Sequence, residues 1–108
     1  MRWRTEVPIP IAGDLRSADA VVTIAAGEIM IEAETRVSDV QLVERRSAAK
    51  GRDLGALRVV LLLADTAHHW TLLRQHPELR QRYPIGTCEV LAALRAGRDP
   101  GGDGLVIL

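Results

Sequence analysis

DAVVTIAAGEIMIEAETR, residues 19–36, alternates apolar and polar side chains over most of its length. A period of two is typical of β-strands, in which successive side chains point to opposite faces. Ala26-Gly27 lies near the centre of the stretch, and glycine is favoured where a chain reverses direction. The stretch therefore predicts a β-hairpin with strands at 19–25 and 28–37.

Three acidic side chains fall on one face of this predicted hairpin. A two-residue turn at 26–27 places Asp19 opposite Glu34. The same register sets Val21 opposite Glu32, whose side chain points the same way as that of Glu34. Directly opposed Cβ atoms lie roughly 4.5–5.5 Å apart, so the carboxylates repel one another unless they reach water, bind protons or share a cation. Two interpretations stay open: a divalent metal site, or a solvated face with arginine partners.

Composition narrows the class of protein. A chain of 108 residues with 47% hydrophobic content predicts one domain spanning residues 1–108. Fourteen basic residues balance fourteen acidic ones, so binding of DNA would need a local basic patch. Cys88 is the only cysteine, which fits a reducing compartment and predicts a cytoplasmic protein. The longest apolar run, 59–64, is far too short for a membrane span, and no membrane partner is expected.

The segments that flank the hairpin also carry local signals. Residues 3–11 alternate loosely but contain two prolines, which lack a backbone donor, so an edge strand beside the hairpin is predicted. After the hairpin, Ser38-Asp39-Val40-Gln41 has the spacing of a capping box, in which side chains of the first and fourth residues satisfy free backbone N–H groups. A helix is predicted from Ser38 to about Lys50, with Gly51 ending it.

The second half of the chain alternates strand and helix. The run ALRVVLLLA at 56–64 predicts a central strand covered on both faces and parallel to a neighbour. Thr66 and Thr87 are predicted to cap helices, the second closed by Gly97. A last strand at 105–108 is expected at an exposed sheet edge, where it could pair with a second copy as a homodimer. The order of elements predicts an α/β fold with a mixed sheet.

This outline and its residues resemble the restriction-endonuclease-like PD-(D/E)xK nuclease superfamily. The likeness is carried by Asp19 in the second strand, by Glu32-Ala33-Glu34 in the third, and by the following helix with Gln41 and Arg45. It implies a nuclease-like domain in which a mixed β-sheet, built from the β-hairpin and a central parallel strand, is flanked by helices.

A narrower resemblance covers most of the chain. The stretches WRTEVPIPIAGDLRSADAV, IEAETR, VVLLLADTAHH and AGRDPGG are similar to the C-terminal domain of actinobacterial helix-turn-helix regulators of the phage-repressor type. This resemblance implies an N-terminal helix-turn-helix domain, or a regulator partner, that reads DNA.

The superfamily likeness implies a set of site residues. Asp19 and Glu32 would be the Mg²⁺ ligands and, with Glu34, the catalytic carboxylates. Such an ion neutralises charge on a phosphodiester during hydrolysis, and oxygen ligands suit it. Glu34 stands where most members have lysine, although some members of the superfamily similarly carry ExE there and remain active. An alternative frame puts Arg36 in that place, where it could orient a phosphate but could not accept a proton.

Residues of the predicted helix are secondary candidates. Gln41 could lie beside the metal or serve only as the capping residue. A basic stripe could hold phosphates or form an ordinary solvated helix surface. Its phosphate-contact candidates are Arg45, Arg46 and Lys50.

Two functions of different classes follow from these observations. The first is a Mg²⁺-dependent DNA endonuclease domain that uses the acidic trio and the basic helix. The second is a non-catalytic dimerisation or effector-sensing domain of a helix-turn-helix transcriptional regulator. A fold by itself does not choose between them.

Overall fold

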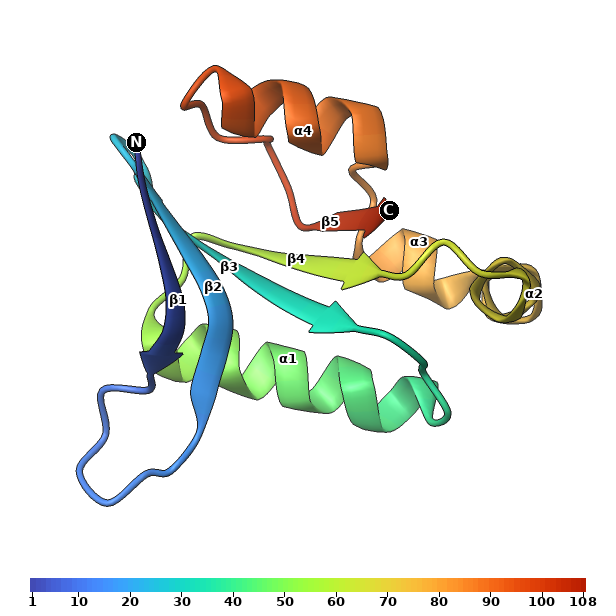
Figure 1. Cartoon of the computed structure of the whole chain (residues 1–108), viewed down its shortest axis with the longest axis horizontal. Helices are drawn as coiled ribbons and strands as arrows, with labels where there is room; N and C mark the ends of the chain where they lie inside the picture. The colour runs from blue at the N-terminus through green and yellow to red at the C-terminus, as the bar shows by residue number, and fades with distance from the viewer.

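The computed structural model describes residues 1–108, and its five strands form one mixed sheet in the order β1-β2-β3-β4-β5. The strands are β1 (Arg2–Pro8), β2 (Ser17–Ile24), β3 (Gly27–Glu34), β4 (Arg58–Leu63) and β5 (Gly104–Ile107). The first three strands pair antiparallel, whereas β4 runs parallel to both β3 and β5. The predicted α/β class with a mixed sheet is confirmed (Figure 1).

Four helices flank the sheet. They are α1 (Val40–Leu54), α2 (Ala67–Gln75), α3 (Glu78–Arg82) and α4 (Thr87–Arg95). One apolar core joins β-strand residues to α1, α2 and α3, and a smaller core on the opposite face joins them to α4. Figure 1 shows α1 behind the sheet and α4 beside β5. None of these helices has the length and apolar character needed to cross a membrane.

The side chains of β4 point alternately into the two cores. Val59, Leu61 and Leu63 belong to the core shared with α1, whereas Val60 belongs to the core shared with α4. This strand is buried on both faces because helices lie on both sides of it and parallel neighbours lie at both edges. The predicted central parallel strand is therefore confirmed, as is the edge strand at the start of the chain.

The predicted hairpin register is wrong by two residues. Ile24 pairs with Gly27, and Val21 pairs with Met30 rather than with Glu32. The turn is therefore Ala25-Ala26, one residue earlier than predicted. Gly27 has φ +151°, a conformation that other residues rarely adopt, so the glycine is required just after the turn and not within it. An even shift keeps the side chains of the paired residues, 20–24 and 27–31, on their predicted faces.

Both predicted ends of α1 are also wrong. Asp39, not Ser38, is the N-cap, and its Oδ1 accepts the backbone N–H of Leu42 at 3.0 Å. The helix continues through Gly51 to Leu54 and ends where Gly55 adopts φ +75°. Gly51 serves close packing instead, because a Cβ there would lie 2.6 Å from Cγ2 of Val59.

Replacing Gly51 with alanine should lower the free energy of unfolding despite the better helix propensity of alanine. Propensity favours alanine by about 1 kcal/mol, but overpacking a buried contact costs about 1–3 kcal/mol, so we expect a net loss of up to about 2 kcal/mol. Urea denaturation measures the change. In a Val59→Ala background the clash is absent, and the same substitution should then be neutral or stabilising. An equal loss in both backgrounds would contradict the packing explanation.

Of the two predicted threonine caps, one is confirmed and the other is wrong. Thr66 caps α2, and its Oγ1 accepts the N–H of His69 at 3.2 Å. Thr87 is instead the first residue of α4, behind the N-cap Gly86, and its Oγ1 accepts the N–H of Ile107 at 3.0 Å. A hydroxyl at this point ties α4 to the neighbouring strand, which is a tertiary contact that no local pattern reveals.

The last strand lies at a sheet edge, as predicted. It is buried, however, whereas the sequence predicts an exposed strand. All four residues of β5 are buried, and its outer side is already engaged. Leu105 donates its N–H to the carbonyl of Ile85 at 2.9 Å, in addition to the bond from Ile107 to Thr87. These bonds leave little of the edge for strand pairing with a second copy.

Two adjacent histidines hold the connection between β3 and α1. His69 is fully buried, with Nδ1 2.7 Å from the carbonyl of Ala64 and Nε2 accepting the N–H of Val37 at 3.0 Å. An imidazole that accepts at one nitrogen and donates at the other is neutral. His68 Nε2 lies 2.6 Å from the carbonyl of the same Val37. Both rings therefore serve the backbone of the loop that links the two elements.

Candidate metal and phosphate site

A fork between β2 and β3 creates the candidate site. Pairing of these strands stops at Ala20 and Ile31, whereas β2 stays paired with β1 as far as Ser17. Figure 1 shows β1 and β2 curving away together while β3 stays beside β4. At the fork Asp19 Oδ2 accepts the N–H of Ala33 at 2.8 Å. A carboxylate thus takes the place of a strand carbonyl, which fixes Asp19 beside β3.

Glu32 is the buried carboxyl of the site. Its exposed fraction is 5%, and Oε1 has no hydrogen-bond partner. Oε2 lies 3.3 Å from Nζ of Lys50 on α1. Burial raises the pKa of Glu32 to about 7; Lys50 opposes this rise and neighbouring Asp19 adds to it. The structure therefore brings Asp19 and Glu32 together, although the strand pairing from which this was predicted stops short of Asp19.

Lys50 is the residue whose place sequence reasoning missed. It was predicted only as a phosphate contact, yet its ammonium points at the buried carboxyl of Glu32. Helical spacing from Arg46 to Lys50 indicates that both share one face of α1, but only the packing of α1 on the sheet aims that face at β3.

Glu34, Arg36 and Gln41 do not join this pair. Glu34 Oε1 lies 3.8 Å from a guanidinium nitrogen of Arg46. No three Asp, Glu, His or Cys side chains are close enough to hold one metal ion, so the predicted acidic trio does not gather into a three-ligand site. Arg36 is exposed and makes no ion pair. Gln41 is exposed at the start of α1 in a separate shallow depression, and its predicted capping-box role is wrong because Asp39 is the cap.

A basic groove of about 520 Å³ adjoins the acidic pair. Asp19 lines it, and its cationic members are Arg16, Arg45, Arg46 and Lys50. Arg16 is neutralised by Asp14 and Asp53, each with an oxygen 2.7 Å from Nη2. Arg45 is exposed and forms no ion pair, and Arg46 has only the long contact to Glu34. These two arginines can therefore bind a phosphate without first breaking a strong ion pair.

The residues present fit a hard divalent cation, although they supply only two carboxylate ligands. Glu32 Oε1 is a buried carboxylate oxygen without a partner, and Asp19 supplies a second carboxylate beside it. Mg²⁺ commonly takes one or two carboxylates and keeps several waters. Lys50 already neutralises part of the negative charge, so the ion would compete with the ammonium. The arrangement therefore suits a weakly held cation.

Comparisons with protein-family models, with curated proteins and with solved structures find no match for this chain. Two carboxylates, an ammonium and a groove with one unpaired and one weakly paired arginine can bind a cation and a phosphate next to each other.

Proposed function

We propose that this chain is a restriction-endonuclease-like domain that binds DNA phosphates and carries weak Mg²⁺-dependent nuclease activity. The observation that carries the proposal is the grouping of Asp19, Glu32 and Lys50 at the fork between β2 and β3. A hairpin followed by a helix and a central parallel strand is the order of elements that the superfamily resemblance implies.

Each group has a distinct part in this proposal. Mg²⁺ bound by Asp19 and Glu32 would neutralise charge on the phosphate and acidify an attacking water. Lys50 stabilises negative charge that develops on the phosphate during cleavage. Arg45 and Arg46 hold flanking phosphates in the groove. Glu34 orients Arg46 across their contact and is not assigned to the ion.

The wider setting belongs to the same proposal. A helix-turn-helix domain or a regulator partner would bring the groove to DNA, because a chain with no net charge has no general attraction for it. The single cysteine, Cys88, is exposed, which supports a reducing compartment such as the cytoplasm. A homodimer would place two such grooves on one duplex.

Metal titration and plasmid nicking test the proposal. We expect wild-type protein to bind Mn²⁺ in calorimetry and to nick supercoiled plasmid slowly with Mg²⁺ or Mn²⁺. Glu32→Gln should abolish metal binding and reduce nicking by about 100-fold or more, because a metal ligand is lost. Lys50→Met should bind Mn²⁺ more tightly, because a competing cation is removed, and should nick more slowly.

Glu28→Gln is the matched control. Glu28 lies on the same strand and is also ion-paired, with Arg4, but it lies outside the groove. This variant should keep wild-type metal affinity and nicking. A wild-type protein that binds neither ion and leaves plasmid intact would refute the nuclease proposal and support the non-catalytic alternative. Metal binding without nicking would support a degenerate site.

A further inference from the structure

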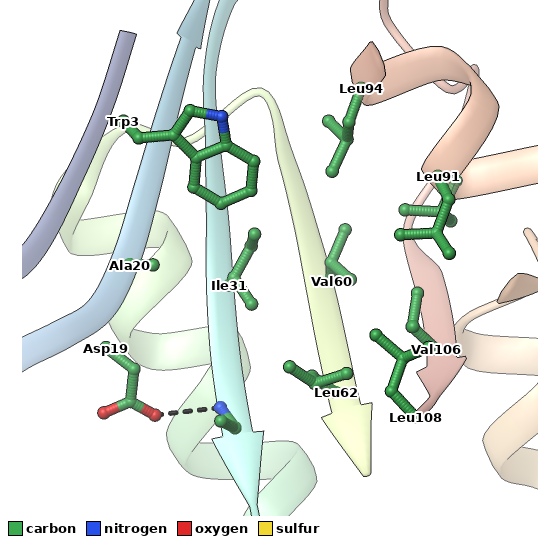
Figure 2. A pocket seen from close by; sticks show the side chains of 12 residues that line it. Trp3, Asp19, Ala20, Ile31, Val60, Leu62, Leu91, Leu94, Val106 and Leu108 are labelled. Carbon is green, nitrogen blue, oxygen red and sulfur yellow. Dashed lines mark hydrogen bonds between the residues drawn. The ribbon is translucent and has the colours of Figure 1, made fainter.

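A second cavity lies on the face of the sheet opposite α1. It has a volume of about 270 Å³ and is lined by β-strand residues and by α4. Ile31, Val60 and Val106 form its floor, while Trp3 of the edge strand and Leu94 of α4 stand on either side (Figure 2). The cavity exists because α4 packs over β4 and β5 and leaves this face of β1 to β3 without a helix.

The lining is almost entirely apolar. Eleven of the twelve residues are hydrophobic, and the exception, Asp19, has one carboxylate oxygen held by the N–H of Ala33. An apolar cavity of about 150 Å³ in another protein is large enough for benzene. A space of 270 Å³ therefore has room for a fused bicyclic ring.

Trp3 supplies a specific surface for such a ring. Its exposed fraction is 51%, which is high for a tryptophan at a β-strand position, and Figure 2 shows its indole leaning over the cavity above Ile31. Aromatic rings gain stabilisation from offset-stacked or edge-to-face contact beyond their buried area. A planar aromatic molecule would cover the exposed indole and the apolar floor at once.

The available surface is too small for a protein partner. Five of the lining residues, Ile31, Val60, Val90, Leu94 and Val106, have exposed fractions of 8% or less, and only Trp3, Ala33 and Leu108 are exposed. A stable protein interface buries about 800 Å² on each side, which a depression with so buried a lining does not offer. Area thus favours a small molecule over a second copy of the chain.

We propose that this cavity is a binding site for a small planar apolar molecule, with one or two fused aromatic rings, stacked against Trp3. The proposal does not depend on the nuclease proposal. Ala33 borders the cavity and donates its N–H to Asp19, so its amide resonance reports on an occupant directly.

Indole is a suitable probe in a two-dimensional NMR titration. We expect saturable shifts of the Trp3 ring N–H, of the Ala33 amide and of the methyl groups of Ile31 and Val106. Ala20→Leu, which fills the cavity from β2, should weaken indole binding by about tenfold or more, because a side chain then occupies the space. Trp3→Ala should also weaken it.

Trp70→Ala is the matched control. Trp70 has a similar exposed fraction, 41%, but lies on α2 outside the cavity. Its replacement should leave indole affinity unchanged, and the amide spectrum of each variant establishes that it is folded. Linear shifts of equal size at both tryptophans, or binding that survives Ala20→Leu, would overturn the proposal. Shifts of the cavity methyl groups with protein concentration alone would show that a second copy occupies the cavity, and would overturn it as well.

Discussion

Replacing His69 with alanine is expected to lower the free energy of unfolding by about 4 kcal/mol, because it removes two buried hydrogen bonds and leaves a cavity. The ring of His69 has no exposed surface. Without it the N–H of Val37 and the carbonyl of Ala64 lose their side-chain partner inside the protein. Chemical denaturation measures the loss. Such a loss is a large share of the total stability of a small domain.

His68→Ala is the natural comparison for this substitution. His68 is half-buried and makes one bond to the carbonyl of Val37, so its loss should cost about 1 kcal/mol. The two variants differ by one position in the sequence but by several kcal/mol in expected effect. Similar losses for both would contradict the role assigned to the buried ring.

Glu32→Gln is expected to stabilise the metal-free protein at alkaline pH by as much as about 3 kcal/mol, the free energy that corresponds to the rise in the pKa of the Glu32 carboxyl on folding. The pKa of Glu32 is raised from 4.5 to about 7, chiefly because its carboxylate is buried. Between these values the folded state binds more protons than the unfolded state. The contribution of Glu32 to stability therefore falls as pH rises through this window and is constant above it.

The difference between variant and wild type isolates this effect. Other carboxyls titrate too. Ion pairs with arginines lower the pKa values of Asp14, Asp53 and Asp99, so the stability that these pairs contribute is lost when the carboxyls are protonated in acid. Those contributions cancel when Glu32→Gln is compared with wild type at each pH. We expect no difference near pH 4.5 and the full difference at pH 8 and above, measured by urea denaturation with a chelator present. A difference independent of pH would contradict the assignment.

Lys50→Met gives a second check on the same carboxyl. The ammonium of Lys50 holds the pKa of Glu32 below the value that burial alone would produce. Its loss should lower stability at pH 8 far more than at pH 4.5. Glu32 would thus be retained at a cost in stability, as is common for residues kept for binding or catalysis.

Local patterns predicted the elements better than their ends. Alternation around residues 19–36 indicated the hairpin, and the run at 56–64 indicated a doubly covered strand, because both depend on side-chain periods that the backbone imposes. The prediction for Gly51 failed because a glycine can serve close packing as well as helix termination. Its contact with Val59 joins a helix to a strand that the sequence alone does not place together.

By itself the sequence determined which side chains of one strand share a face, since they alternate with a period of two: Glu32 and Glu34 both point toward α1. Only the tertiary structure decided what meets them there. The fork that binds Asp19 to Ala33, the ammonium of Lys50 beside Glu32 and the cavity under Trp3 all depend on how helices pack against the sheet. Packing brings together residues that are far apart in the chain, and the local periodicity of the sequence does not predict which of them come into contact.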